Sequence, residues 1–281
     1  MSARELWDAL ERDQIEVHLQ SEVWLEDGRH FGFEALPRWR HPTAGLISGE
    51  DFMPSAERTS ISLPLARRLV ERACQELEGR DGMRPDALVS VAPTGLSESG
   101  IYGAVTSALD ATGTAPGRLC LEVPSLLSPE QLNGAREAWS ELRRHGVRFA
   151  LDRCGAGAEN GLESDAVPHD LLAAFQFDYV RLDRALVQAV SRSAQARRLV
   201  AAIARSASEA EAITVADGIE TNTEVIAAYG LGCRVAQGPR FGSPSPPRFA
   251  PAPTGEGKSE AVAAPSRGPG FGPQPGLAPA G

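Results

Sequence analysis

Acidic and amide side chains recur at one kind of position in this sequence, the end of an apolar, strand-like run. Glu34, Glu122, Asp152, Asp217 and Gln237 each fall at or just beyond the last residue of such a run. A carboxylate on an apolar strand is costly unless its charge is compensated, so a chance scatter of surface acids explains the pattern poorly. If the strands close into a parallel barrel, their C-terminal ends meet at its catalytic face. We therefore predict that these five residues form one polar ring.

The elements that must position this ring are strand-like runs alternating with helical patterns. Residues 15–19 and 31–36 alternate apolar and polar side chains, and the Asp27-Gly28 turn signal lies between them, so these runs should pair as an antiparallel hairpin. Helical patterns cover 130–145 and 184–205. Further strands are expected at 87–91, 119–123, 147–152, 179–183, 212–216 and 233–237. Eight strands interleaved with helices indicate an α/β fold, a TIM-like (β/α)8 barrel with one antiparallel strand.

Length and composition bound the class of protein. The 281 residues are 42% hydrophobic, enough for one large core, and a net charge of −9 argues against nucleic acid as a partner. Four scattered cysteines without metal-site or disulfide spacing favour reduced thiols in the cytoplasm. The apolar stretches are too short for membrane insertion. Prolines become frequent from Pro244 onward, so we expect a barrel domain over 1–247 and a disordered Pro/Gly-rich tail over 248–281.

Several segments carry a recognisable signature when they are taken in order. They include Phe33-Glu-Ala-Leu-Pro-Arg-Trp-Arg-His-Pro, Ala150-Leu-Asp-Arg-Cys-Gly-Ala-Gly, Phe177-Asp-Tyr-Val-Arg-Leu-Asp-Arg, Ala216-Asp-Gly-Ile-Glu-Thr and Gln237-Gly-Pro-Arg-Phe-Gly-Ser-Pro. Together they resemble the EAL-domain family of cyclic di-GMP phosphodiesterases over nearly all of residues 1–247. The resemblance implies the same barrel and a two-metal site that hydrolyses a phosphodiester.

The resemblance also assigns roles to particular positions of this chain. Glu34, Glu122 and Asp152 match metal ligands of the family. Arg38 is suited to contact a phosphate, because a guanidinium can donate two parallel hydrogen bonds to it. The positions that match nucleotide contacts are Gln20, Glu34, Leu36, Arg38 and Gln237.

The sequence departs from the family pattern at numerous positions, four of which belong to its metal and catalytic residues, so we expect no catalytic residues. Ala92 stands where the family has a metal-binding asparagine, Arg153 where it has the second aspartate, Arg181 where it has the catalytic lysine, and Asp217 where it has a glutamate. A guanidinium about 5 Å from a divalent ion would be repelled by roughly 6–7 kcal/mol at an effective dielectric near 20, and on this ground Arg153 carries the most weight. We expect a vestigial, unoccupied metal site and no cofactor, with Mg²⁺ or Mn²⁺ needed only for residual activity.

The residues leave several functions open. The surviving carboxylates could pair with Arg153 and Arg181 in an internal ion-pair network, or these arginines could face the phosphates of a cyclic dinucleotide. The degenerate domain would then act as a cyclic di-GMP-binding effector in bacterial signalling, or as a regulator that binds an unidentified protein partner. The alternative is a weak, metal-dependent phosphodiesterase that forms the linear dinucleotide pGpG.

Overall fold

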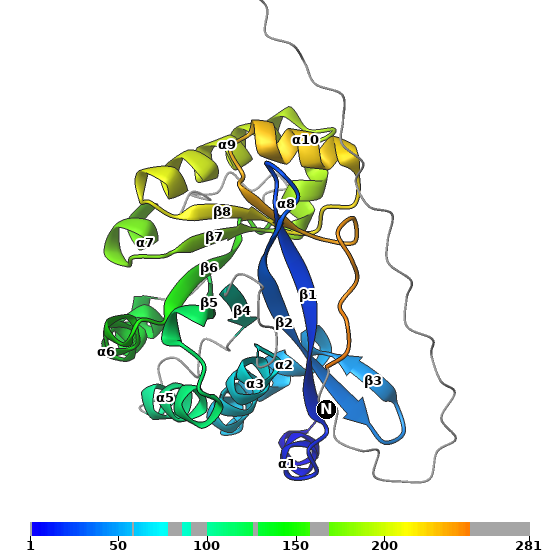
Figure 1. Ribbon diagram of the computed structural model, residues 1–281, viewed down its shortest axis with the longest axis vertical. Coiled ribbons are helices and arrows are strands. Elements are labelled where there is room, and N and C mark those ends of the chain that lie inside the picture. The colour runs from blue at the N-terminus through cyan, green and yellow to red at the C-terminus, as the bar shows by residue number, and fades with distance from the viewer. Residues whose placement is uncertain are drawn as a thin grey trace, which may run out of the picture. The chain divides into compact units, whose positions relative to one another are not determined.

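The described strands form one sheet, and all but β3 close into a ring (Figure 1). The computed structural model describes residues 2–57, 59–77, 86–90, 100–125, 129–157 and 169–247. The predicted tail, 248–281, and Ala92 lie outside the described residues. The strands are β1 (Ile15–Trp24), β2 (His30–His41), β3 (Gly45–Ser48), β4 (Asp86–Ser90), β5 (Leu119–Pro124), β6 (Arg148–Cys154), β7 (Tyr179–Leu182), β8 (Ile213–Ala216) and β9 (Val235–Gln237).

Strand β1 closes the ring because it pairs antiparallel with β2 along one edge and with β9 along the other. The remaining neighbours, from β2 through β4 to β9, pair in parallel. The predicted TIM-like barrel with one antiparallel strand is confirmed. In this arrangement the C-terminal ends of the parallel strands share one face of the barrel.

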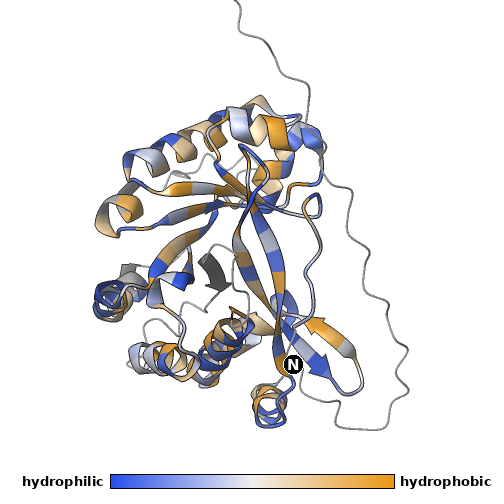
Figure 2. Ribbon diagram, in the orientation of Figure 1, coloured by the Kyte–Doolittle hydropathy of each residue, from blue (hydrophilic) through white to orange (hydrophobic). Residues whose placement is uncertain are grey.

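Helices follow the strands and cover the outside of the barrel (Figure 1). Helix α3 (Ser62–Leu77) buries Leu65, Leu69, Ala73 and Leu77, which recur on one stripe. The helical ribbons carry hydrophilic and hydrophobic residues side by side, as amphipathic helices do (Figure 2). The other helices are α1 (Ala3–Glu11), α2 (Gly49–Glu57), α5 (Ile101–Thr112), α6 (Pro129–His145), α7 (His169–Ala174), α8 (Arg184–Ala189), α9 (Ala194–Glu209) and α10 (Asn222–Gly230).

Inside the barrel, a polar layer of side chains follows directly on an apolar one. A buried apolar cluster takes one residue from each of six strands: Phe31, Cys120, Ala150, Tyr179, Val215 and Val235. Because side chains alternate between the two faces of a strand, the residue two positions further along points into the barrel again. On five of these strands that residue is polar: Glu122, Asp152, Arg181, Asp217 and Gln237. The apolar cluster therefore packs directly beneath these polar residues inside the barrel.

The β1–β2 hairpin extends beyond the ring. It turns at Asp27-Gly28 as predicted, where Gly28 adopts a φ of 70°. Glu34 lies within β2 and not at its end, because β2 continues to His41 and pairs with β3, a short strand that the sequence analysis did not include. Only Gly32–Ala35 of β2 pair with β4, so Glu34 still lies near the end of the part that belongs to the ring.

The helical pattern predicted over 184–205 is divided between two helices, α8 and α9. Helix α8 ends at Ala189, and α9 begins after Ser193, whose side chain accepts a hydrogen bond from the Ala196 amide. A serine in this position satisfies an otherwise unpaired amide at the start of a helix, which favours a new start there.

Helix α10 begins with a capping box that ties it to the loop carrying Asp217. The Thr221 side chain accepts from the Glu224 amide, and the Glu224 carboxylate accepts from the amides of Thr221 and Glu220. Thr221→Ala is expected to lower the free energy of unfolding by about 1 kcal/mol, measured in urea. Thr223→Ala, an exposed position two residues into the same helix, should change it by less than about 0.5 kcal/mol. Equal effects of the two substitutions would contradict the role of the cap.

Candidate functional site

A pocket of about 600 Å³ opens over the polar layer of the barrel. Its walls come from β1, β2, β3 and α2, from the C-terminal ends of β5, β6, β7 and β9, and from the segments that follow β7, β8 and β9. The structure brings into it the five residues predicted to form a ring and the positions matched to nucleotide contacts. They are Gln20, Glu34, Leu36, Arg38, Glu122, Asp152, Asp217 and Gln237.

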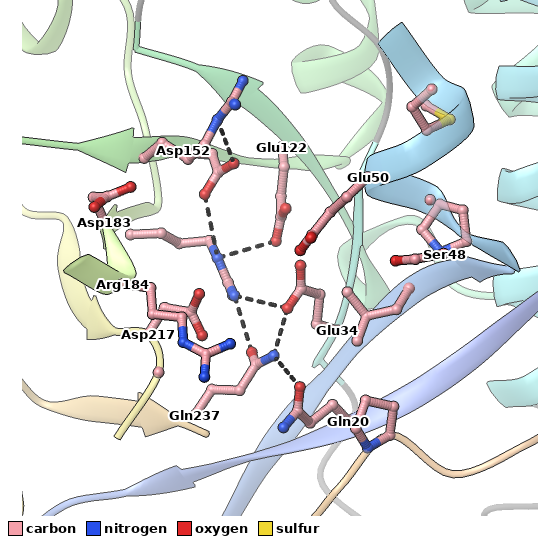
Figure 3. A pocket seen from close by; sticks show the side chains of 18 of the residues that line it. Gln20, Glu34, Ser48, Glu50, Glu122, Asp152, Asp183, Arg184, Asp217 and Gln237 are labelled. Atoms are coloured by element: carbon pink, nitrogen blue, oxygen red, sulfur yellow. Dashed lines mark hydrogen bonds and ion pairs between the residues drawn. The ribbon is translucent and has the colours of Figure 1, made fainter. Parts of the chain in front are cut away.

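The guanidinium of Arg181 lies among the carboxylates of this site. The side chains of Glu34, Glu122, Asp152 and Asp217 gather in the same part of the pocket (Figure 3). The Arg181 Nη2 donates to Glu34 at 3.0 Å and to Gln237 at 2.9 Å. Its Nε lies 3.2 Å from the carboxylate of Glu122 and 3.7 Å from that of Asp152. The Arg181 side chain is almost fully buried, so these interactions occur away from water and the charges are weakly screened.

The third nitrogen of this guanidinium, Nη1, donates to Glu22 of β1, a residue that the sequence analysis did not include. Glu22 is completely buried, and in the antiparallel register it lies opposite Gln237. The only signal in the sequence is its spacing: Glu22 stands two residues after Gln20 on the same strand, so both side chains face the interior of the barrel. Arg181 thus faces four carboxylates, those of Glu22, Glu34, Glu122 and Asp152.

Burial and mutual repulsion disfavour ionisation of the acids in this cluster. Burial raises the pKa of Glu22 to about 7, against the opposing attraction of Arg181. Burial and the nearby Glu34 raise the pKa of Asp217 to about 6. The pKa of Asp152 is also raised, again mainly by burial. Burial alone would lower the pKa of Arg181, but the surrounding carboxylates raise it well above its usual value, so this guanidinium stays charged.

Two glutamines connect this cluster to the C-terminal segment at the pocket rim. The Gln237 amide donates to Glu34 and to Gln20 Oε1, the latter at 3.0 Å. Gln20 in turn donates to the carbonyl of Gly242 at 2.9 Å. Two further backbone hydrogen bonds join Leu19 and Ser245, so the segment after β9 runs along the edge of β1. Both glutamines are therefore held in fixed orientations before any ligand arrives.

Arg153 takes a position different from the one that the sequence suggested. The register between β6 and β7 shifts between Leu151 and Cys154, and Arg153 has a φ of 53°. Such a bulge re-aims a side chain, and here the Arg153 side chain is 61% exposed at the rim. Among the residues that the structure describes, its ion pair is with the neighbouring Asp152, at 3.7 Å, and the Ser125 hydroxyl donates to its backbone carbonyl. The cation that occupies the centre of the site is Arg181.

Arg38 and Arg184 also line the pocket. Arg38 donates through Nη1 to the carbonyl of Pro37 and to Ser48 Oγ, and within the described part of the chain it forms no ion pair with a carboxylate. Arg184 pairs with Glu220 at 3.0 Å, and both side chains are about half exposed. A guanidinium such as that of Arg38, without a carboxylate partner among the described residues, is suited to an anionic group.

The arrangement does not fit a two-metal centre. The carboxylates matched to metal ligands, Glu34, Glu122 and Asp152, all face the Arg181 guanidinium. Across the residues that the structure describes, no group of three or more histidine, cysteine, aspartate or glutamate side chains is placed to hold a metal ion. A cation bound among these oxygens would lie beside a fixed positive charge that already uses them.

A match to a family model accounts for the barrel and for the order of its motifs. The model of the EAL domain matches residues 3–244. The chain belongs to the EAL domain family. An uncharacterized signaling protein of Caulobacter vibrioides is 30% identical to this EAL domain over 244 residues, which are 87% of the chain and 29% of that protein. The bifunctional diguanylate cyclase/cyclic di-GMP phosphodiesterase MucR of Pseudomonas aeruginosa is 28% identical over 86% of the chain and 35% of its own length.

A solved structure resembles the EAL domain in three dimensions. The PaMucR phosphodiesterase in complex with c-di-GMP superposes with a TM-score of 0.76 at 26% identity, over 86% of this chain and 96% of that one. The chain spans about a third of the length of the curated relatives described above. None of the helices in the described ranges is long and apolar enough to cross a membrane.

Proposed function

We propose that this EAL domain binds cyclic di-GMP in the pocket and does not hydrolyse it. The observation that carries the proposal is the Arg181 guanidinium, which takes up the carboxylates that a two-metal centre would need. The nucleotide-facing part of the pocket is retained, because Gln20, Leu36 and Arg38 line it. The PaMucR structure supports this ligand, since it is a c-di-GMP complex of a similar EAL fold.

Calorimetry with cyclic di-GMP tests the binding proposal. Wild type is expected to bind, and Arg38→Ala to weaken binding about 10- to 100-fold, because hydrogen bonds to a charged phosphate are worth about 1.5–3 kcal/mol each. Arg29→Ala is the matched control, because Arg29 is exposed on the hairpin turn and pairs with Asp27. No heat at high micromolar ligand with folded wild-type protein would contradict binding.

Chromatography of the reaction products tests the absence of hydrolysis. Wild type incubated with cyclic di-GMP and either Mg²⁺ or Mn²⁺ is expected to release no linear pGpG. Formation of pGpG that is lost in Glu34→Ala would instead support the weak phosphodiesterase, because Glu34 matches a metal ligand of active family members. Measuring both metals matters, because ligand geometry and softness affect which divalent ion a site prefers.

We further propose that the domain acts in the cytoplasm by contact with an unidentified protein partner. A domain that releases no product can pass a signal only through binding. All four cysteines are buried free thiols, which suits a reducing compartment. An effector should retain a co-purifying partner in a nucleotide-dependent way, and Arg38→Ala should abolish that dependence. A partner that co-purifies to the same extent with and without the nucleotide, and with wild type and Arg38→Ala, would instead favour a domain that only binds proteins.

A further inference from the structure

Glu22 is a fully buried acid, and in the described part of the chain its carboxylate pairs with Arg181 and no other side chain. Its second oxygen, Oε2, has no hydrogen-bond partner among the described residues. A buried carboxylate is costly, and one with half of its acceptors unused is more so. The contact with Arg181 is the interaction that compensates this buried charge.

The guanidinium that Glu22 holds turns all three of its nitrogens toward side chains of the barrel. Nη1 faces Glu22, Nη2 faces Glu34 and Gln237, and Nε faces Glu122 and Asp152. Arg181 is 1% exposed, below the pocket surface. Its effect on a ligand is therefore electrostatic. Its positive charge offsets the negative charge of the carboxylates at the base of the pocket, which we call its floor and which would otherwise repel a phosphate.

Glu22 differs from the other acids in where it holds the guanidinium. Glu34, Glu122 and Asp152 line the pocket, whereas Glu22 does not. Glu22 thus contacts Nη1 from outside the pocket lining, from the antiparallel strand β1. Without that contact Arg181 would keep only partners on the pocket side, and its side chain could swing outward and release the remaining carboxylates.

We propose that Arg181 is a built-in cation that replaces divalent metal in this pocket, and that Glu22 is the positioning residue that keeps it there. The pocket then accepts an anionic ligand without divalent cations and excludes these cations from its floor. The ligand part of this inference rests on the proposed binding of cyclic di-GMP. The metal part does not, because it concerns the folded protein and a metal ion alone.

Mn²⁺ alone is the probe for the metal part, with binding followed by the electron paramagnetic resonance of free Mn²⁺ and by thermal unfolding. Wild type is expected to bind no Mn²⁺ and to keep its Tm. The double variant Glu22→Gln/Arg181→Met retains Glu34, Glu122 and Asp152, oxygen ligands of the kind Mn²⁺ prefers, without the competing cation. It should bind Mn²⁺, and metal at about a hundredfold excess over its dissociation constant should raise its Tm by several degrees.

Arg153→Ala is the matched control for the double variant. It removes a positive charge from the rim but leaves Arg181 in place, so it should bind no Mn²⁺. Mn²⁺ binding by wild type, or by Arg153→Ala to the same extent as by the double variant, would overturn the proposal. Failure of the folded double variant to bind Mn²⁺ would overturn it as well.

Single substitutions at Glu22 test its positioning role while Arg181 is retained. In Glu22→Gln the amide oxygen still accepts from Nη1, so Mn²⁺ should remain without effect. In Glu22→Ala the anchor is lost, and Mn²⁺ should raise the Tm. A merely structural role would lower the Tm of Glu22→Ala equally with and without Mn²⁺, and that result would refute the positioning role.

The ligand part is tested by titrating wild type with cyclic di-GMP in EDTA and in Mn²⁺. The two affinities should agree within about twofold, because the floor already carries its own cation. Binding that requires Mn²⁺ would overturn the built-in cation. Absence of binding in both buffers, with the Mn²⁺ results as expected, would instead refute the proposed function and leave the metal exclusion standing.

Discussion

Unfolding of the Arg181→Met variant in urea at neutral pH is expected to require about 3–5 kcal/mol less free energy than unfolding of wild type. Methionine keeps much of the apolar stem but removes the charge, leaving Glu22, Glu34, Glu122 and Asp152 without their shared cation. Breaking a buried ion pair from one side is costly because the remaining charge stays desolvated. The loss is limited because these carboxyl groups can take up protons.

Arg184→Met provides the matched control for this measurement. Arg184 follows the same strand and lines the same pocket, but its pair with Glu220 is about half exposed. Exposed pairs contribute about 0–1 kcal/mol, so this substitution should change the free energy of unfolding by no more than that. Similar decreases in the free energy of unfolding for the two variants would show that the buried ion pairs of Arg181 do not stabilise the barrel interior.

The second large effect is a pH dependence of stability that originates at Glu22. Burial raises the pKa of its carboxyl to about 7 in the folded protein, from 4.5 as the reference value. The folded state therefore holds a proton that the unfolded state releases between these two values. The contribution of Glu22 to stability is fully present below about pH 4.5 and is lost as the pH rises to 7. The total loss is roughly 3 kcal/mol.

Comparison with Glu22→Gln isolates this contribution, because glutamine resembles the protonated acid and does not titrate. The free energy of unfolding of wild type, relative to the variant, should fall between pH 5 and pH 7 and stay level from pH 7.5 to 8.5. Asp217 and Asp152, whose pKa values are also raised, remain in both proteins and cancel. A difference that does not vary with pH, or that grows as the pH rises, would contradict the raised pKa of Glu22.

The amino-acid sequence by itself determined the barrel, its antiparallel hairpin and the polar residues that meet in the pocket. These features follow from local rules. Alternation with a period of two sends Cys120 and Glu122, or Val235 and Gln237, to the same interior face, and parallel strands bring their ends to one side of the barrel. The motifs around Glu34 and Asp152 were specific enough to identify the EAL domain family.

Which arginine occupies the centre of the site was decided only by the tertiary structure. The sequence placed the most weight on Arg153, next to Asp152, but a bulge in β6 turns Arg153 to the exposed rim. The central position belongs to Arg181, whose partner Glu22 lies 159 residues earlier in the chain. Strand periodicity states which face a side chain takes, but not which charges meet across a closed barrel. That depends on register, bulges and ring closure, which arise only when distant strands pair.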